Sequence, residues 1–414
     1  MDFSKILFVF GYIVSNTKTQ NNNPALCPWN PYKATVIEKV SYVGAQLWKC
    51  LIDTDKKQDR VLLWEQSLLL QNWGINEGNR TDVFIESKHI FQMTKNFKDN
   101  NIDALVHVSN FQKWIDEQNP PLKKLKAKLH RLTWKRYHRL ADIDSYLDYL
   151  SATYGKICSL HVIGHSVENR PLRVLKISNG RRGNKALWID GGIHAREWIS
   201  PATVTYIINH ILKNWSKRGI LQNVDWYFLP VLNPDGYEYS HTHDRLWRKN
   251  RRFYGSCYGT DLNRNFGYAW GQSGSSSCPC HDDYSGPRPF SEPESEAVRN
   301  FIESTRHYWE GFLTFHSFGQ IIFYQGYDLK KLANSLAKKM EHVNGVMYAT
   351  VPLTNEPTSG GSNEWAKMIM KIKYAFSIEL RDLGNRGFIL PYWNIVPSGK
   401  EGVAAVMRII KKIK

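Results

Sequence analysis

An imidazole and a carboxylate stand three residues apart at His194 and Glu197, and this spacing is the first sign of chemistry in the chain. Both side chains are good ligands for Zn²⁺. The pair alone is weak evidence, because His and Glu share a surface face by chance in many proteins. A catalytic zinc takes three protein ligands and leaves one position open, so a third ligand must come from another part of the chain. His316 is the candidate, because it ends the apolar, strand-like run at 312–315.

A hydrolytic zinc site also needs a general base that takes a proton from water, and Glu379 is the candidate. In the run 374–380, alternation predicts a strand with residues 374, 376 and 378 on one face and 375, 377 and 379 on the other. A carboxylate on an otherwise apolar strand is costly unless it is used or paired. The alternative is a buried ion pair between Glu379 and Arg381 or another arginine.

The elements that must position the first pair are a strand and the helix that follows it. Residues 186–190 predict a short apolar strand, and the two glycines after it permit a tight turn. Ser200 is expected to cap a helix that has proline at its first position and continues to Leu212. His194 and Glu197 therefore lie between a strand and a helix, where open α/β sheets place their sites.

The first fifteen residues, 1–15, are predicted to be a secretory signal peptide. The apolar run 6–14 follows Lys5 and is too short to span a bilayer. A polar stretch begins at residue 16, as expected for a mature N-terminus. The alternative is a buried N-terminal strand. The signal peptide predicts a secreted, extracellular protein.

Residues 16–118 predict a small α+β domain. Short strands are expected at 82–85 and 103–108, and short helices at 41–51 and 111–117.

Residues 119–131 predict a basic linker, since two prolines are followed by a lysine-rich run. A trypsin-like protease could cut such an exposed segment in a secreted protein. The alternative is a basic amphipathic helix that is never cleaved. A second, larger domain would then span 132–414.

Composition excludes several classes of protein. The chain has 414 residues with 42% apolar and 22% charged side chains, enough to bury a sizeable core, which excludes a disordered protein. No run approaches the roughly 18 apolar residues of a membrane-spanning helix, so we expect no membrane partner. The net charge of +17 is interpreted as a solvated basic surface. No zinc finger, RNA-recognition signature or phosphate loop accompanies it, so we expect no nucleic-acid partner.

Seven short motifs lie at 192–200, 233–236, 245–251, 261–265, 316–317, 359–362 and 379–382. They occur in the order found in zinc metallocarboxypeptidases, and from about Tyr137 onward the chain resembles a procarboxypeptidase of the pancreatic, digestive A/B type. This resemblance implies an α/β fold in which a mixed, twisted sheet carries helices on both faces. It also implies that residues 16–118 are the inhibitory pro-segment of a zymogen.

The resemblance also assigns roles around one Zn²⁺ per chain. It implies that His194, Glu197 and His316 are the zinc ligands and that Glu379 is the general base. Arg248 would hold the scissile carbonyl oxygen as charge develops on it, which is oxyanion-hole chemistry.

Other residues are assigned to the substrate in the same way. Asn263 and Arg264 would clamp the terminal carboxylate of the peptide, because a guanidinium binds a carboxylate in a bidentate pair. Arg196 would extend the substrate groove. The resemblance further implies a disulfide between Cys257 and Cys280. It leaves the other four cysteines, at 27, 50, 158 and 278, unassigned.

The sequence departs from the family pattern at the substrate end. Glu356 stands where the family has a tyrosine that closes on the bound C-terminal residue, and Phe318 replaces a second tyrosine. Tyr348 is a candidate substitute. Asn363 occupies the position that sets side-chain preference in the family, and its neutral amide predicts neutral or apolar C-terminal residues.

The sequence thus predicts a secreted, monomeric zymogen of a zinc metallocarboxypeptidase that acts on the C-termini of peptides and proteins. Its activation would need a trypsin-like protease. The alternative is a carboxypeptidase-like zinc-binding protein with weak or no turnover.

Overall fold

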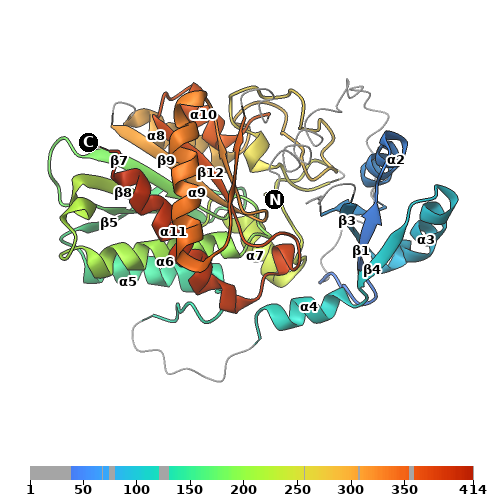
Figure 1. The fold of residues 1–414 in the computed structure, drawn as a ribbon. Helices are drawn as coiled ribbons and strands as arrows, with labels where there is room; N and C mark the ends of the chain where they lie inside the picture. The colour runs from blue at the N-terminus through green and yellow to red at the C-terminus, as the bar shows by residue number, and fades with distance from the viewer. Residues whose placement is uncertain are drawn as a thin grey trace.

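The computed structural model describes residues 39–67, 69–73, 80–120, 130–255, 257–305, 308–353 and 359–413. The predicted signal peptide at 1–15, most of the predicted linker at 119–131 and Glu356 lie outside these residues. We refer to residues 39–118 as the N-terminal unit and to residues 130–413 as the C-terminal unit (Figure 1).

The N-terminal unit is built on a four-stranded antiparallel sheet with the strand order β2-β3-β1-β4. Apolar side chains of α2 and α3 share a core cluster with one face of this sheet. The strands are β1 (Gln46–Leu51), β2 (Gln71–Asn72), β3 (Arg80–Ile85) and β4 (Ala104–Val108), and the helices are α2 (Asp55–Gln66), α3 (Ile90–Asp99) and α4 (Phe111–Gln118).

The helix predicted at 41–51 is wrong, because β1 occupies Gln46–Leu51. This strand lies between β3 and β4 and has apolar residues on both faces. Trp48 and Cys50 join the core shared with α2 and α3, whereas Leu47 joins a cluster on the other face. A strand covered on both faces loses the alternation of apolar and polar residues that identifies a half-buried strand. The strands expected at 82–85 and 103–108 and the helix at 111–117 are confirmed within a few residues.

The C-terminal unit is built on an eight-stranded mixed sheet with the order β11-β10-β12-β9-β7-β8-β6-β5. The central strands β12, β9, β7 and β8 are parallel to one another, and antiparallel pairs flank them. The strands are β5 (Cys158–His165), β6 (Pro171–Ile177), β7 (Lys185–Asp190), β8 (Val224–Leu229), β9 (Trp309–Ser317), β10 (Ile321–Tyr324), β11 (Ala349–Pro352) and β12 (Tyr374–Leu380).

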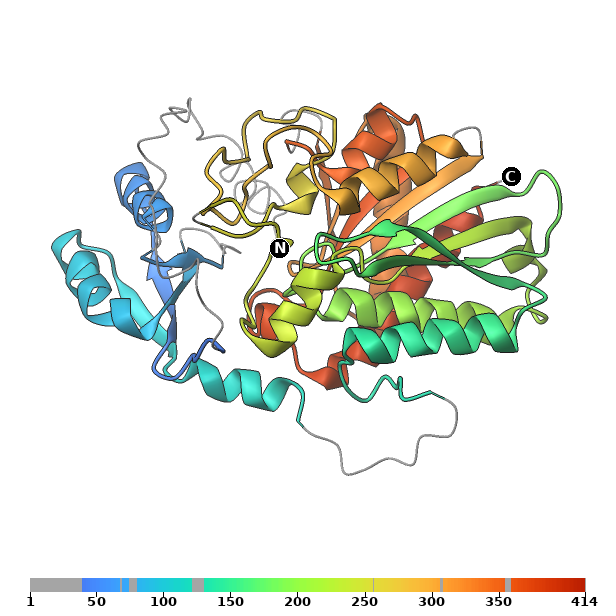
Figure 2. The same ribbon diagram turned by 180° about the vertical axis from the view of Figure 1, so that it is seen from behind.

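Helices cover both faces of the larger sheet, so the predicted α/β architecture is confirmed (Figures 1 and 2). One face packs against α5 (Leu140–Thr153), α6 (Ile199–Asn214), α9 (Lys330–Asn344) and α11 (Ile395–Ile410). The other packs against α8 (Pro293–Ser304) and α10 (Ser362–Met368). The predicted faces of β12 are confirmed, since residues 374, 376 and 378 belong to the first core and residue 375 to the second.

The helix after β7 begins differently from the prediction. Helix α6 starts at Ile199, and Ser200 is not its N-cap. The Ser200 hydroxyl instead donates to the carbonyl of Phe315 at 2.6 Å and accepts from the amide of Gly192 at 3.0 Å. Ser200 therefore ties the loop after β7 to β9, a tertiary use that a local capping pattern does not reveal.

The second face of the small sheet packs against loops of the C-terminal unit. Leu47, Trp73 and Phe84 share one apolar cluster with Leu246 and Ile389. The two units are therefore joined by side-chain packing as well as by the chain between them. Within the described part of the chain, no helix combines the length and apolar character needed to cross a membrane.

Candidate metal centre and its surroundings

Three neighbouring parallel strands bring the predicted metal and base residues to one edge of the sheet. The loop that follows β7 carries His194 and Glu197, and His316 lies near the end of β9. Glu379 of β12 stands directly opposite His316 in the parallel register. Aligned residues on neighbouring parallel strands point to the same face, so Glu379 and His316 share one face of this edge.

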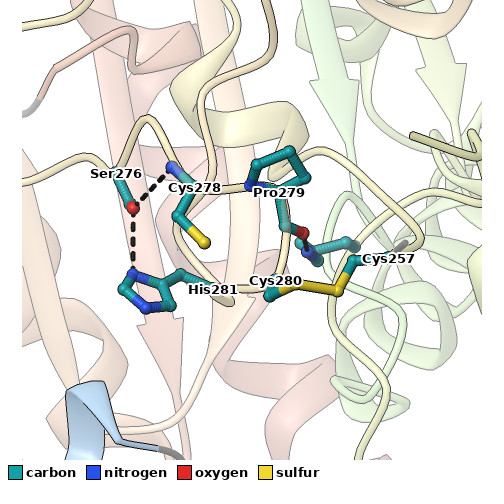
Figure 3. Close-up of a disulfide and its surroundings, with 7 residues drawn as sticks. Cys257, Ser276, Cys278, Pro279, Cys280 and His281 are labelled. Atoms are coloured by element: carbon teal, nitrogen blue, oxygen red, sulfur yellow. Dashed lines mark hydrogen bonds between the residues drawn. A yellow bond between two sulfur atoms is a disulfide. The ribbon is translucent and has the colours of Figure 1, made fainter. Parts of the chain in front are cut away.

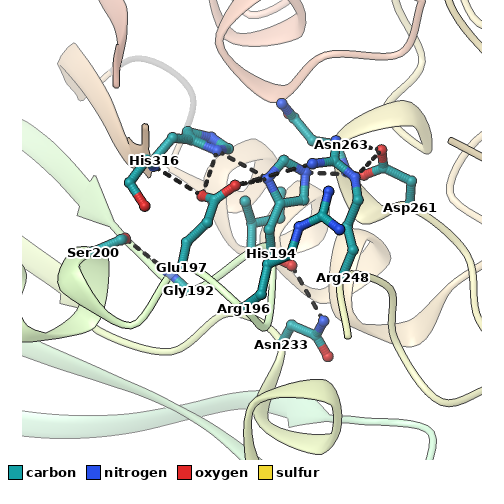
Figure 4. A network of polar contacts seen from close by, with 12 residues as sticks. Gly192, His194, Arg196, Glu197, Ser200, Asn233, Arg248, Asp261, Asn263 and His316 are labelled. Carbon is teal, nitrogen blue, oxygen red and sulfur yellow. Dashed lines mark hydrogen bonds and ion pairs between the residues drawn. The ribbon is translucent and has the colours of Figure 1, made fainter. Parts of the chain in front are cut away.

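His194, Glu197 and His316 converge as a buried triad (Figure 4). The Nδ1 atoms of the two histidines are 3.2 Å apart, and the Glu197 carboxylate lies 2.8 Å from Nδ1 of His194 and 3.3 Å from Nδ1 of His316. Two ligand atoms about 2.1 Å from a zinc ion at a tetrahedral angle lie about 3.4 Å apart. The three side chains thus fit a tetrahedral zinc with one open position.

The loop that carries the first two residues needs a glycine at position 192. Gly192 has φ = 63°, and a Cβ there would lie 3.0 Å from Pro201 and 3.3 Å from the backbone of Val231. Both the positive φ and the close approach favour glycine. Gly192 therefore permits the tight turn between β7 and His194.

Each imidazole is oriented by a hydrogen bond at its other nitrogen. Nε2 of His194 lies 3.1 Å from the buried carboxylate of Asp261. Nε2 of His316 lies 3.1 Å from the hydroxyl of Thr314, which donates to the buried Asp190 at 2.7 Å. Such partners fix the ring so that Nδ1 presents its lone pair to a metal.

The surroundings of the triad favour the ligand forms of two of its groups, His194 and Glu197. Burial lowers the pKa of His194, and the nearby Arg248 lowers it further, so the imidazole stays neutral. Burial alone would raise the pKa of Glu197, but His194 and His316 outweigh it and hold the pKa well below its usual range. The result is an ionised carboxylate beside a neutral imidazole, the donor set that zinc prefers.

Glu379 is half-buried and forms no ion pair with the described residues. Arg381, the partner considered in the sequence, pairs with the buried Glu401. Within the described ranges, no hydrogen bond or ion pair involves the Glu379 carboxylate. Burial raises the pKa of Glu379 to about 8, and the neighbouring His316 opposes the rise. A carboxyl group with a raised pKa next to the triad is suited to proton transfer.

Arg248 points into the site from the other side (Figure 4). Its Nε and Nη2 donate to Asp261 at 3.0 and 2.7 Å, and its Nη1 lies 4.0 Å from the Glu197 carboxylate. Burial would raise the pKa of Asp261, but Arg248 and His194 together hold it well below its usual range. One carboxylate therefore orients both an imidazole of the triad and the guanidinium beside it.

Asn263 and Arg264 lie just beyond Asp261 in the chain, and their polar atoms are only partly used. The Asn263 side-chain oxygen accepts from the amide of Ser362 at 3.0 Å, which leaves its NH₂ group available as a donor. Arg264 donates from Nε to the carbonyl of Gly274 at 2.7 Å and from Nη1 to that of Asn263 at 3.0 Å. No carboxylate among the described residues forms an ion pair with Arg264.

Arg196 is held between aromatic and acidic partners. Its Nη1 lies 3.1 Å from Asp282, and its guanidinium stacks 4.3 Å from the ring centre of Phe388. Its buried Nε has no hydrogen-bond partner in the described structure. Arg196 therefore still has one donor to offer at this edge of the site.

Asn363 is buried, and its side-chain nitrogen likewise lacks a hydrogen-bond partner among the described residues. It begins α10 beside Ser362, whose amide is bound to Asn263. Asn363 is thus connected through Ser362 to the predicted carboxylate clamp. Glu356 lies outside the described residues.

Tyr348 does not line the site, so its proposed substitution for the family tyrosine is wrong. Its hydroxyl donates to the buried Glu401 at 2.8 Å, and its ring belongs to the core under α9 and α11. Phe318 is instead close to the triad in sequence. Its ring lies 4.8 Å from that of Phe388 and 6.0 Å from Trp73 of the N-terminal unit.

The disulfide implied by the resemblance is present. Cys257 and Cys280 are bonded (Figure 3), and Cys50 and Cys158 are free, buried thiols.

Sequence reasoning missed Asp261, Thr314 and Asp190, the groups that orient the imidazoles. Asp261 lies in the motif 261–265, so the sequence indicated that it is near the site. Its partners, His194 and Arg248, come from other loops and could not be inferred from this motif. Thr314 stands two residues before His316 on β9 and so shares its face, which period-two alternation could have indicated.

Comparison with known proteins gives concordant results. The family model described as zinc carboxypeptidase matches residues 143–405. The carboxypeptidase B of Astacus astacus is 42% identical over 299 residues, covering 68% of this chain and 99% of that protein. Zinc carboxypeptidase A 1 of Anopheles gambiae is 32% identical over 395 residues, covering 91% of each chain. The crystal structure of thrombin activatable fibrinolysis inhibitor superposes with a TM-score of 0.81 at 30% identity, covering 89% of this chain and 98% of that one.

Proposed function

Because this chain belongs to the zinc carboxypeptidase family and is a metallocarboxypeptidase, we propose that it is a secreted zymogen that removes neutral or apolar residues from the C-termini of peptides and proteins. The observation that carries this proposal is the placement of Glu379 opposite His316, beside a triad whose spacing fits zinc. His194, Glu197 and His316 would hold the ion. When bound, zinc polarises a carbonyl and lowers the pKa of water.

The chain's own residues then supply the proton transfers and the charge stabilisation. The Glu379 carboxylate takes a proton from the attacking water and delivers it to the nitrogen of the leaving amino acid. Arg248, fixed by Asp261, faces the carbonyl oxygen on which negative charge develops. A cation held in place before the reaction stabilises that charge without reorganisation.

Restriction to the last peptide bond follows from the clamp. Arg264 and the NH₂ group of Asn263 would bind the free carboxylate of the substrate, with charge-assisted hydrogen bonds. A cationic anchor at a fixed place relative to the triad positions only the terminal bond for attack.

Asn363 supports a neutral preference at the terminal side chain. The names of the relatives divide between carboxypeptidases A and B, so they do not decide the preference. A buried amide nitrogen without a partner offers a hydrogen bond but no charge. Such a group gives no reason to bind lysine or arginine tightly, and it can donate a hydrogen bond to a neutral acceptor such as a side-chain amide oxygen.

The contacts of the N-terminal unit support its role as an inhibitory pro-segment. Gln118 at the end of α4 accepts from Arg245 at 2.8 Å and donates to the carbonyls of Phe388 and Leu390 at 3.0 and 3.1 Å. Trp73 lies against Phe318 and Phe388. Phe318 is two residues from His316, Arg245 is three residues from Arg248, and Phe388 stacks on Arg196. The N-terminal unit thus rests on segments that border the site.

The direct test is limited trypsin digestion followed by assays of C-terminal release. We expect the cut form to release the terminal residue from a peptide with a free carboxylate, and a zinc chelator to abolish release. The intact chain should be much less active, and a peptide with an amidated C-terminus should be resistant. Equal activity before and after confirmed cleavage would contradict the zymogen proposal, and hydrolysis of the amidated peptide would contradict the clamp.

A zinc-binding protein with weak turnover is a second candidate, favoured by Glu356 and Phe318 in place of two family tyrosines. A carboxylate near the substrate's own carboxylate would weaken binding, since two like charges about 4 Å apart at an effective dielectric of 20 repel by about 4 kcal/mol. Glu356→Tyr should then lower KM for a substrate with a free C-terminus and leave an amidated peptide unaffected. A change in KM of less than about twofold would remove Glu356 from the site.

Secretion is supported by the disulfide between Cys257 and Cys280, because disulfides persist in oxidising compartments. We propose a monomer activated by a trypsin-like protease. Sedimentation of the intact and cut forms would test the oligomeric state.

A further inference from the structure

The turn after α6 carries an acceptor pattern for an N-linked glycan. Asn214, Trp215 and Ser216 form the tripeptide Asn-x-Ser, in which x is not proline, and this pattern accepts oligosaccharides in secreted proteins. Such a tripeptide is common by chance, so its place in the fold decides whether it is a site. Asn214 is the last residue of α6, and the chain turns directly after it.

This turn lies at the surface and satisfies its own backbone. Ser216 and Lys217 are exposed, and Asn214 is half-buried. The carbonyl of Asn214 accepts from the amides of Lys217 and Arg218 at 3.0 and 3.1 Å. The turn therefore keeps its shape without help from the side chains of the tripeptide, and those side chains are accessible from solvent.

The side-chain amide of Asn214 can carry a sugar and still keep its present hydrogen bond. Its Nδ2 donates to the carbonyl of His210, one turn earlier in α6, at 2.8 Å. An amide NH₂ group has two hydrogens, and this bond uses one of them. No second acceptor among the described residues binds the same nitrogen. Attachment of a sugar would replace the second hydrogen and leave the bond to His210 in place.

We propose that Asn214 is the attachment site of an N-linked glycan, an inference that rests on the proposed secretion of the chain. The bond that forms joins Nδ2 of Asn214 to the anomeric carbon of an oligosaccharide carried on a lipid diphosphate. The bond that breaks joins this carbon to the diphosphate, which leaves with the electron pair. Nδ2 gives up one proton, and nothing is oxidised or reduced.

The glycan would lie far from the metal centre. Helix α6 begins two residues after Glu197 and rises about 1.5 Å per residue, so Asn214 lies about 22 Å along its axis. After the turn, the chain enters β8 at Val224, which pairs with Lys185 at the start of β7. His194 and Glu197 follow the other end of β7. The glycan is therefore at the opposite edge of the sheet and leaves the site open to substrate.

Peptide mapping of the chain expressed in a eukaryotic host tests the assignment. Cleavage before aspartate yields residues 190–224, which contain the pattern at 214–216, and residues 59–81, which contain the second Asn-x-Ser/Thr pattern of the chain, at 79–81. Peptide N-glycosidase then converts a glycosylated asparagine to aspartate, which takes up a label from heavy-oxygen water. We expect labelled aspartate at position 214.

The outcome separates this inference from the proposed secretion. An unmodified peptide 190–224 from a chain recovered in the medium would overturn the glycan and leave secretion standing. A chain that stays inside the cell without a glycan would overturn both.

Variants test whether the tripeptide directs the modification. Ser216→Ala keeps Asn214 and its bond to His210 but removes the hydroxyl, and Asn214→Gln removes the acceptor asparagine. We expect both variants to lose the glycan from peptide 190–224. Asn223→Gln is the matched control, because Asn223 is exposed, lies in the same peptide and belongs to no such pattern. A glycan that persists in Ser216→Ala would overturn the N-linked assignment.

Activity tests the placement of the glycan away from the site. After cleavage of the linker, we expect the glycosylated wild type and Ser216→Ala to hydrolyse a peptide with a free carboxylate at the same kcat/KM. A changed kcat/KM in Ser216→Ala, with Asn223→Gln unchanged, would overturn this placement. If labelled aspartate is found at position 214 and no form of the chain is active, the glycan stands and the peptidase function fails.

Discussion

The metal end of the site and its substrate end differ in how their polar side chains are bound. The metal end comprises the triad and Glu379, and the substrate end comprises Arg196, Asn263, Arg264 and Asn363. At the metal end, the second nitrogen of each imidazole is bound, to Asp261 for His194 and to Thr314 for His316. At the substrate end, buried donors of Arg196 and Asn363 have no partner among the described residues. Among the described residues, the imidazoles of the metal end are thus bound by the protein, whereas two buried donors of the substrate end are available to a ligand.

The difference shows which interactions substrate binding can supply. A buried donor without a partner costs about 1–3 kcal/mol, and a ligand that supplies an acceptor recovers this cost. The metal end gains nothing of this kind, because its imidazoles are already oriented in the absence of substrate. We therefore expect changes at the metal end to affect the ion and the rate, and changes at the substrate end to affect KM and preference.

The largest expected effect is at the ligands themselves. His316→Ala or His194→Ala should abolish both zinc retention and peptidase activity, because only three protein ligands hold the ion. Zinc content by elemental analysis and the release assay would measure both losses in one preparation. The control is His342→Ala, on the outer part of α9. Stoichiometric zinc in either variant would contradict the assignment of these histidines as zinc ligands, and with it the comparison between the two ends.

Glu379→Gln should keep the zinc but lose turnover. The amide has nearly the same shape and cannot accept a proton, so we expect kcat to fall by about 10²- to 10⁴-fold, as is typical of a general base. KM should change little. Glu310→Gln, at the opposite end of the sheet on β9, is the matched control. A near-normal kcat would assign the base to another residue.

Arg264→Gln should affect binding rather than chemistry. Loss of a charged hydrogen bond of about 1.5–3 kcal/mol predicts a rise in KM of about tenfold to 100-fold for peptides with a free C-terminus. Zinc content should stay unchanged, and Arg299→Gln on α8 should match the wild type. An unchanged KM would leave the clamp to Asn263 alone.

Asp261→Asn probes the group that serves both ends. Loss of the carboxylate removes the partner of His194 and of Arg248, and such partners typically contribute 10- to 100-fold in metal affinity. Competition with a chromogenic chelator would measure the change, with Asp328→Asn at a surface ion pair as control. Unaltered zinc affinity would show that Asp261 acts on Arg248 only.

The smallest expected effect concerns preference. Asn363→Asp should raise kcat/KM for a C-terminal lysine relative to phenylalanine by about tenfold, since it places a charge where the wild type has a neutral amide. The exposed Asn300→Asp is the control. If the wild type already favours lysine, the neutral pocket is wrong, although the rest of the substrate end can stand.

The sequence allowed the prediction of those parts of the site that depend on strand alternation. Glu379 and His316 are near the ends of apolar strands, and their alignment follows from parallel pairing of β12 with β9. The groups behind them could not be found in this way. Asp261 and His194 are in contact although they are 67 residues apart in the chain. Glu401 binds both Arg381, which was expected to pair with Glu379, and Tyr348, which was expected to line the site. Such pairings depend on distances in the folded structure, which the spacing of residues along the sequence does not reveal.

The fold was predictable to the level of its layers, with errors where a tertiary contact overrode a local pattern. Serine is a typical helix N-cap, but Ser200 binds the backbone of β9 instead. Strand β1 does not alternate between apolar and polar residues, because both of its faces are covered. In each case a residue that fits one local rule is used by a distant element.

The parallel arrangement of β7, β9 and β12 also sets the order in which the molecule can assemble. His194 and His316 are 122 residues apart in the chain, and neither meets Glu379 until the last strand of the sheet is in place. Contacts of such long range form late, because the chain must first lose the entropy of closing long loops. The N-terminal unit closes shorter loops and emerges first during synthesis, so we expect it to fold ahead of the sheet on which it rests. Zinc uptake would then mark the end of folding, and the time course of metal binding during refolding would report the completion of the central sheet.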